Sequence, residues 1–361
     1  MTWLLLLAAL LLAAWAFVRF RLGGRDLSAF DMPVYAPIRE APSPEHQEVL
    51  HTLGDMAKTT EGLRGRARLD TLRHLFDHMS DDADLSDLSI HPVDAGGVPG
   101  EWVVPPEPRD GGRLLYIHGG AFTLGSARGY RRVTAEIARR TGLSVLAIDY
   151  RLMPEHRRAD GIEDCRAAYR WVLDNGPDGP AAASALFVAG DSAGGNLTLM
   201  LIAWARDLGL RPADGAIALS PATDSTFASP SLRHNVEKDP MLGPMAAMVS
   251  RVPRSVLLLG MWLNTRLSPA NPVVSPLRGF LGDLPPTLVQ ASEAEILIDD
   301  ARRYVNKAKH EGSPARLETW HGMIHVWQAF AGSLPEADEA YERIARFIDD
   351  CYPERRKADA A

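Results

Sequence analysis

Apolar and polar residues follow two alternating patterns through most of the chain after residue 87. Short, mostly apolar runs indicate strands: an initial hairpin region is expected at 88–93 and 100–106, a buried strand at 113–117, and further strands at 143–150, 185–190, 215–221, 286–292 and 315–320. Segments with apolar residues at helical spacing separate them, and helices are expected at 130–142, 162–176, 193–209, 300–310 and 335–350. This alternation predicts an α/β fold, with a mostly parallel sheet covered by helices on both faces. In such sheets functional residues gather at the carboxyl ends of the strands.

Two segments do not follow this alternation of strands and helices. Residues 26–86 are polar, with helices expected at 46–58 and 67–79 and an acidic stretch at 80–87 that lacks the glycine and terminal glutamate of a calcium loop. Residues 225–275 are apolar and rich in methionine, and no strand is evident among them. They are expected to form a helical insertion over the top edge of the sheet.

The N-terminus is apolar without being amphipathic. Residues 3–18 carry no charge, and Arg19, Arg21 and Arg25 follow them. At ~1.5 Å per residue the run spans about 24 Å, and it approaches a ~30 Å hydrocarbon core if the first two arginines snorkel. We therefore expect residues 1–25 to form a single-pass membrane anchor, with the body in the cytoplasm by the positive-inside tendency. The alternative is a signal peptide, cleaved near the small residues at 14–16, and secretion.

Composition and charge narrow the classes of function. The 361 residues are 46% hydrophobic and 24% charged, as in ordinary globular proteins. A net charge of −7 without a basic block argues against nucleic acid as a partner. Cys165 and Cys351 lie far apart, which predicts neither a disulfide framework nor a metal site.

The stretch VAGDSAGGN at 188–196 matches G-x-S-x-G, and it lies between an expected strand and an expected helix. In that context Ser192 occupies a sharp turn at positive φ, which costs roughly 1–3 kcal/mol. Gly190 and Gly194 must lack side chains because neighbouring chain passes close by. The turn presents the Ser192 oxygen at a helix N-terminus, where the N–H of Ala193 is free to stabilise an oxyanion.

A serine nucleophile needs a base, and the base needs an acid. His325 follows the last expected strand, and His321 is its rival; Gly322 between them favours a loop over a metal-binding helix. The acid should follow the strand at 286–292, where the candidates are Glu293, Glu295, Asp299 and Asp300. The order serine, acid, histidine along the chain is that of the α/β-hydrolases.

The stretch YIHGGAF at 116–122 predicts the remaining part of an acyl-transfer site. Small residues after a strand end let backbone N–H groups face a developing negative charge. We assign the oxyanion donors to Gly120 and Ala121, beside Ala193. Each such donor typically contributes about 10²–10³-fold in rate.

Together these motifs resemble the hormone-sensitive-lipase-like family of α/β-hydrolase esterases. HGGAF, DYRLMPEH, GDSAGGN, LPPTLVQASEAEILIDDA and WHGMIHVW occur in the family's order between about 85 and 350. The resemblance implies an esterase for short- to medium-chain acyl esters that needs no cofactor. It makes Ser192 the nucleophile, His325 the general base and Glu295 the acid, where most relatives have aspartate. Glu293 and Asp299 are the alternatives for the acid.

The resemblance also implies supporting residues and a cap. The residues expected to brace the oxyanion loop are His118, Asp149, Glu155 and His156. Segments 26–86 and 225–275 would form the cap, 87–224 and 276–352 the catalytic domain, and 353–361 a flexible tail. The candidate walls of the substrate pocket are Phe122, Met241 and Trp262, with Met245, Met248 and Met261 nearby.

Two positions depart from the family pattern. Ala121 replaces the third glycine of the HGG turn, which leaves the backbone N–H intact. RRADG at 157–161 replaces an apolar, proline-containing run and puts the local packing in question. Two other functions stay open on the same motifs: an amide deacetylase of the arylacetamide-deacetylase type, and a non-catalytic ligand-binding protein. The sequence makes no prediction of the oligomeric state.

Overall fold

The computed structural model describes residues 2–352, so the expected tail at 353–361 lies outside the described residues. Its centre is an eight-stranded sheet with the order β1-β2-β4-β3-β7-β8-β9-β10. The strands are β1 (Ser89–Asp94), β2 (Pro99–Val104), β3 (Gly112–Ile117), β4 (Ser144–Ile148), β7 (Ala185–Asp191), β8 (Gly215–Leu219), β9 (Thr287–Ser292) and β10 (Ala315–Trp320). Each of the eight expected strands is present. A separate two-stranded ribbon, β5 (Asn175–Gly176) and β6 (Gly179–Pro180), was not expected.

The sheet is parallel except at one edge. β1 and β2 pair antiparallel with each other, and β2 pairs antiparallel with β4. The remaining neighbours, from β4 through β3 and β7 to β10, run parallel. At the centre, Leu115 of β3 lies opposite Leu146 of β4 and Val188 of β7. The predicted α/β sheet is confirmed.

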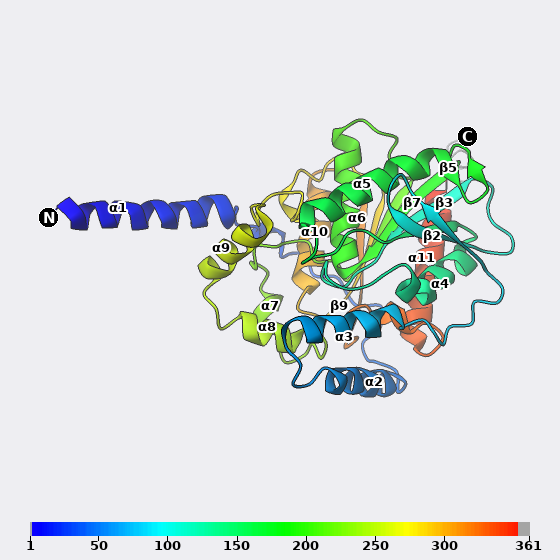
Figure 1. The fold of residues 1–361 in the computed structure, drawn as a ribbon, viewed down its shortest axis with the longest axis horizontal. Coiled ribbons are helices and arrows are strands. Elements are labelled where there is room, and N and C mark those ends of the chain that lie inside the picture. The colour runs from blue at the N-terminus through cyan, green and yellow to red at the C-terminus, as the bar shows by residue number, and fades with distance from the viewer. Residues whose placement is uncertain (1, 353–361) are drawn as a thin grey trace.

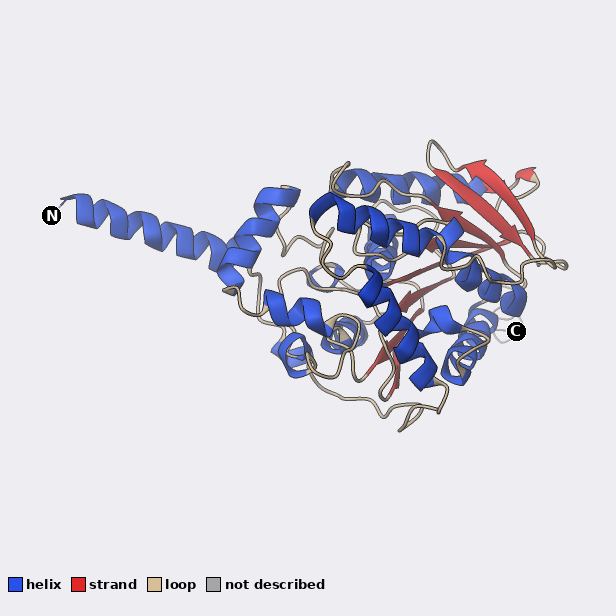
Figure 2. Ribbon diagram, turned by 60° about the horizontal axis from the view of Figure 1, so that its bottom comes forward, coloured by secondary structure: helices blue, strands red, loops and turns tan. Residues whose placement is uncertain are grey.

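Helices cover both faces of the sheet, as Figure 2 shows. The core on one face joins the sheet to α4 (Arg131–Thr141) and α11 (Pro335–Cys351). The core on the other joins it to α5 (Arg158–Asp174), α6 (Ser192–Asp207) and α10 (Ile298–His310). Along β3, Leu114 and Tyr116 belong to the first core, and Leu115 and Ile117 to the second. This alternation is the two-residue period of a strand buried on both faces.

The two irregular segments lie outside the sheet (Figure 1). The first contains α2 (His46–Thr59) and α3 (Gly65–Asp77), close to the expected ranges. The second contains α7 (Ser231–His234), α8 (Gly243–Val249) and α9 (Arg254–Thr265), so the expected helical insertion is present. Short 3-10 turns complete the structure at η2 (Ser28–Phe30), η3 (Arg128–Tyr130), η4 (Pro276–Arg278) and η5 (Trp327–Phe330).

The N-terminal segment projects from the body (Figures 1 and 2). α1 (Thr2–Ala16) continues directly into a π-helical segment, η1 (Phe17–Leu22). Within residues 2–352, no single helix has both the length and the apolar character to cross a membrane. Helices α8 and α9, which meet at a bend of 103°, together have the length and composition of a broken membrane span, and only these two properties support that assignment.

Candidate active site

The turn that carries Ser192 lies between the central strand β7 and helix α6. β7 is buried along its whole length, and Ser192 is the first residue of α6, with φ of 51°. A Cβ added at Gly194 would overlap the carbonyl oxygen of Ile117, at the end of neighbouring β3. The glycine therefore lets the helix start close against the sheet, and the left-handed turn holds the serine at the carboxyl edge of the strands.

His325 connects Ser192 to Glu295. The Ser192 hydroxyl lies 2.9 Å from Nε2 of His325, and Nδ1 of the same ring lies 2.7 Å from Oε2 of Glu295. With Nδ1 protonated and donating to the carboxylate, Nε2 is free to accept the serine proton. His325 and Glu295 are both buried, whereas Ser192 is partly exposed. The structure thus brings together Ser192, His325 and Glu295, the acid that the family resemblance implies among the candidates after β9.

Glu295 is held on its other side by groups from two strands. Its Oε1 accepts hydrogen bonds from the Ser220 hydroxyl, just after β8, at 2.7 Å and from the backbone N–H of Ser292 at 2.8 Å. The side-chain amide of Asn235 donates to the backbone carbonyls of Glu293 and Glu295, which fixes the turn after β9. These contacts leave Oε2 directed at the imidazole. Neither Ser220 nor Asn235 carried a signal in the sequence.

The rival acids and the rival histidine have other partners. Glu293 and Asp299 both form ion pairs with Arg302. Asp300 accepts the backbone N–H groups of Thr223 and Asp224, and its pKa is raised to about 7 by burial and by the nearby charge of Asp224. His321 is exposed, and its backbone N–H bonds to Arg39.

Two opposing effects act on the pKa of His325. Burial favours the neutral ring and by itself would lower the pKa. The charge of Glu295 and its hydrogen bond favour the protonated ring, and together with Asp239 and Asp191 they raise the pKa above its ordinary value of 6.5. The site therefore stabilises an imidazolium, the species that forms when a histidine accepts a serine proton.

The HGGAF turn presents unbonded amides beside the serine. Gly120, Ala121 and Phe122 have φ of 95°, 54° and 63°, so three consecutive residues lie in the left-handed region. Within residues 2–352, the N–H groups of Gly120 and Ala121 have no protein acceptor. Ala193 lies in the first turn of α6, where N–H groups lack intrahelical acceptors. The three predicted oxyanion donors therefore have N–H groups available for a ligand.

Asp191 fixes the start of this turn, although the sequence analysis did not single it out. Its carboxylate accepts hydrogen bonds from the hydroxyls of Tyr116 (2.7 Å) and Tyr130 (3.2 Å) and from the N–H of Gly119 (2.9 Å). Burial raises the pKa of Asp191 to about 6 despite these bonds. The signal in the sequence was an acidic residue inside a strand that is otherwise apolar.

Three of the four predicted bracing residues contact the loop or its surroundings. The side chain of His118 stacks on Tyr150 with ring centroids 4.4 Å apart, and burial lowers its pKa to about 4, so the ring is neutral. Asp149 accepts the backbone N–H of Ala127 at 2.7 Å, beyond the turn. Glu155 contacts the loop only indirectly, through Arg73.

Glu155 pairs with Arg73 of α3, and Arg73 in turn donates to the carbonyl of Thr123 at 2.9 Å. The hydrogen bond from Arg73 is the main reason that the pKa of Glu155 is lowered to about 2. The fourth predicted residue, His156, is not brought to the loop. Its side chain is exposed, and its backbone N–H donates to the carbonyl of Leu152.

Arg158 is a buried guanidinium beside the oxyanion turn that the sequence analysis did not predict. It lies 3.9 Å from the ring centroid of Phe122, and it donates to the Asn196 side chain (3.0 Å) and the Val274 carbonyl (3.2 Å). Burial lowers its pKa to about 10. It belongs to RRADG, so a cation fills the place where the family pattern has an apolar run. The packing there is built around a cation–π contact.

The predicted pocket walls separate in the structure. Phe122 lies at the oxyanion turn, against Arg158. Met241 is exposed, and Trp262 packs edge-on against Phe17 of the N-terminal segment, with ring centroids 5.3 Å apart. Met245 and Met248 are exposed as well. Met241, Met245 and Met248 are thus open to solvent, and Trp262 contacts the N-terminal segment.

Comparisons with known proteins agree with this architecture. The family profile of the α/β hydrolase fold matches residues 114–329. The crystal structure of an esterase from the bacterial hormone-sensitive lipase family superimposes with a TM-score of 0.74 at 36% identity, over 85% of this chain and 98% of that one. The chain belongs to the hormone-sensitive-lipase-like family of α/β-hydrolase esterases. The predicted resemblance is confirmed.

Two further relatives of this hormone-sensitive-lipase-like chain are named for hydrolysis. An acetyl-hydrolase from Streptomyces hygroscopicus is 34% identical over 268 residues, which cover 73% of this chain and 85% of that protein. An esterase from Acinetobacter venetianus is 33% identical over 260 residues, which cover 72% and 82%. Membership of the family makes the chain a hydrolase of the serine type. In residues 2–352, no cluster of histidine, cysteine and acidic side chains could hold a metal ion.

Proposed function

We propose that the protein is a serine carboxylic ester hydrolase that works through an acyl-enzyme on Ser192. The observation that carries the proposal is the continuous chain of hydrogen bonds from the Ser192 hydroxyl through His325 to Glu295. A buried acid, an imidazole with a raised pKa and a partly exposed hydroxyl are the parts that nucleophilic catalysis needs.

In the first half of the reaction, Nε2 of His325 takes the hydroxyl proton while Oγ of Ser192 attacks the ester carbonyl carbon. The carbonyl oxygen becomes an oxyanion that the N–H groups of Gly120, Ala121 and Ala193 stabilise. The bond to the alcohol oxygen then breaks, His325 donates its proton to the departing alcohol, and the acyl group remains on Ser192. Glu295 stabilises the imidazolium and keeps its own charge throughout.

In the second half, water attacks the acyl carbon and gives a proton to the same nitrogen of His325. The bond between Oγ and the acyl carbon breaks, the proton returns to Ser192, and the carboxylic acid leaves. We infer that the acyl chains are short to medium in length. The name of the Streptomyces relative, an acetyl-hydrolase, supports the short end of that range.

The test is to trap the acylated serine. A fluorophosphonate probe should label the wild-type protein on the tryptic peptide that contains Ser192, and mass spectrometry should show p-nitrophenyl butyrate leaving a butyryl group there. Ser192→Ala should take up neither group. Labelling at another serine, or none in a folded and active protein, would refute the mechanism.

We also propose that the N-terminal segment attaches the enzyme to a membrane, with the body on the cytoplasmic side. α1 and η1 form one continuous helical segment from Thr2 to Leu22, about 30 Å long at ~1.5 Å per residue. The side chains of Trp3, Leu12 and Phe20 are more than half exposed. Flotation with lipid vesicles should recover the full chain but not a chain without α1, while both hydrolyse a soluble aryl ester.

A further inference from the structure

Helix α9 carries an apolar stripe that nothing in the described chain covers. Val256, Leu259 and Leu263 are 55%, 39% and 48% exposed, and their spacing places them on one face of the helix. The only charged residue of α9, Arg254, turns inward and donates to the carbonyls of Thr226 and Gly23. The outer face of α9 is therefore uncharged.

This helix lies beside the base of the N-terminal segment. Trp262 on α9 meets Phe17 of η1, and Figures 1 and 2 both show α9 where the projecting helix reaches the body. η1 also carries Arg19 and Arg21. Arginines that flank an apolar span lie at the level of the lipid headgroups. If α1 enters a bilayer, α9 must lie at that same level.

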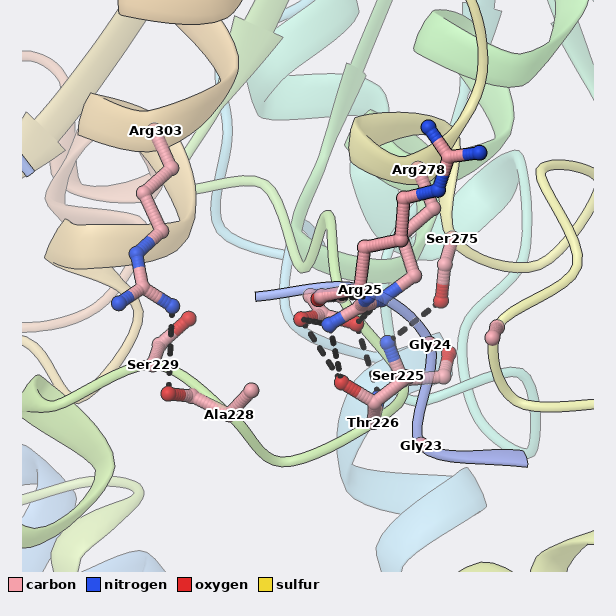
Figure 3. A network of polar contacts seen from close by, with 12 residues as sticks. Gly23, Gly24, Arg25, Ser225, Thr226, Ala228, Ser229, Ser275, Arg278 and Arg303 are labelled. Atoms are coloured by element: carbon pink, nitrogen blue, oxygen red, sulfur yellow. Dashed lines mark hydrogen bonds and ion pairs between the residues drawn. The ribbon is translucent and has the colours of Figure 1, made fainter. Parts of the chain in front are cut away.

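Polar contacts also hold residues 21–25 against the part of the chain that follows α9. Ser268 donates to the Arg21 carbonyl at 2.7 Å, and Arg278 donates to the Arg25 carbonyl at 2.9 Å. Arg278 is itself paired with Asp224 at 2.7 Å, and both side chains are almost wholly buried. Figure 3 shows Arg278 and Thr226 beside residues 23–25. A side chain at Gly24 would overlap the guanidinium of Arg278, so the chain fits closely there.

The chain segment that contains α9 carries basic residues and no acidic ones. No acidic residue occurs between Pro240 and Gly282, although the whole chain has a net charge of −7. Arg251 and Arg266, which flank α9 on either side, are exposed. An apolar stripe with basic ends is complementary to an anionic bilayer surface, where apolar side chains enter the acyl boundary and arginines meet phosphates.

We propose that α9 is a second membrane contact, lying in the headgroup region of an anionic bilayer with Val256, Leu259 and Leu263 toward the acyl chains. The proposal rests on the membrane attachment proposed above for residues 2–22. In this arrangement the cap also contacts the bilayer, so the body is attached at two points and not by the N-terminal segment alone.

The experiment places an environment-sensitive fluorophore on α9. Leu259→Cys and, as a matched control, Leu208→Cys are labelled with a nitrobenzoxadiazole probe. Leu208 is also exposed, but it follows α6 at the end remote from Ser192. The native Cys165 and Cys351 are buried and give little background. The full chain is reconstituted into phosphatidylcholine vesicles that contain phosphatidylglycerol.

The probe at position 259 should emit at shorter wavelength than the probe at 208. Doxyl-labelled lipids should quench it severalfold more strongly than the control, and aqueous iodide should quench it severalfold less. Equal responses at the two positions would overturn the proposal. A shielded probe at 259 that doxyl lipids do not quench would overturn it too, since a second copy of the chain would then cover the stripe.

Two further readouts on the same samples separate this proposal from the proposed function. If the labelled protein does not float with the vesicles, the attachment of residues 2–22 fails and this proposal fails with it. If it floats while iodide quenches position 259 freely, only the contact by α9 is refuted. Hydrolysis of soluble p-nitrophenyl butyrate reports on the ester hydrolase independently and should be unchanged in both variants.

Discussion

At the scale of single residues, the orientation of His325 depends on how Glu295 is held. A glutamate is one methylene longer than an aspartate, and a longer side chain has more rotamers to restrict. Here the Ser220 hydroxyl and the Ser292 N–H both bond to Oε1, and burial removes water from the carboxylate. The second oxygen is thereby aimed at His325.

Glu295→Gln should lower kcat by roughly 10⁴-fold, because an amide can present its N–H₂ to the ring and stabilise the wrong tautomer. The measurement is steady-state hydrolysis of p-nitrophenyl butyrate. Glu293→Gln is the matched control: this glutamate is two residues away and pairs with Arg302, so its kcat should stay near that of the wild type. Equal losses in the two variants would show that the assignment of the acid is wrong.

The raised pKa of His325 gives a prediction for pH. The base must be neutral to accept the serine proton, so kcat/KM should fall as pH drops through a pKa that lies above 6.5. In Glu295→Gln the charge that raises this pKa is gone while burial still lowers it, so the inflection should move to lower pH. An inflection that stays at the same pH, or moves to higher pH, would contradict the proposal that the charge of Glu295 raises the pKa of His325.

Sequence patterns predicted the residues that carry out the chemistry better than the residues that hold them in position. The serine and histidine stood in motifs whose spacing implied their roles. Selection among four acids depended on which one the contacts of Ser220 and Ser292 reach, which no local pattern records. Arg158 was missed because an arginine that follows a turn normally faces solvent. Here Phe122 and Asn196, from distant parts of the chain, enclose it.

At the scale of elements, the close approach of α6 to the sheet depends on Gly194. Gly194→Ala should destabilise the fold by about 3 kcal/mol or more, because the added methyl group would meet the backbone of Ile117 and His118, which cannot yield as a side chain can. Urea unfolding is the measurement.

Gly260→Ala is the matched control for this substitution. Gly260 lies inside α9 with nothing within 4 Å of the added methyl group, so alanine should stabilise the protein by roughly 0.5–1 kcal/mol. A Gly194→Ala variant as stable as Gly260→Ala would mean that the turn does not lie tightly against β3.

Element boundaries followed the sequence where apolar periodicity was strong. The eight strands and the main helices formed close to the expected ranges, and the inner strands β3, β4, β7, β8 and β9 are buried along their whole length, which explains their apolar runs. α5 begins at Arg158, ahead of the expected residue 162, because the Asp160 carboxylate accepts the N–H of Arg157 and caps the helix there. The ribbon of β5 and β6 was too short to leave a pattern.

At the scale of the whole molecule, the buried pair of Arg278 and Asp224 joins the N-terminal segment to the body. Arg278→Met should cost roughly 3–5 kcal/mol of unfolding free energy, because it leaves the buried Asp224 charge without a partner. The variant should also become more sensitive to proteolysis near residues 23–25, because the Arg25 carbonyl loses its donor.

The control for this variant is Arg128→Met. Arg128 pairs with Asp81 at the surface, where both side chains are about half exposed, so its loss should change the unfolding free energy by less than about 1 kcal/mol. Similar losses for the two arginines would refute a special role for the buried pair.

The proposed hydrolysis depends on Ser192 as the group that attacks the ester. The most direct test is turnover of p-nitrophenyl butyrate by Ser192→Ala, with folding verified by its unfolding curve. We predict a loss on the order of 10⁶-fold in kcat. A folded Ser192→Ala protein that hydrolyses the ester at the wild-type rate would contradict the account.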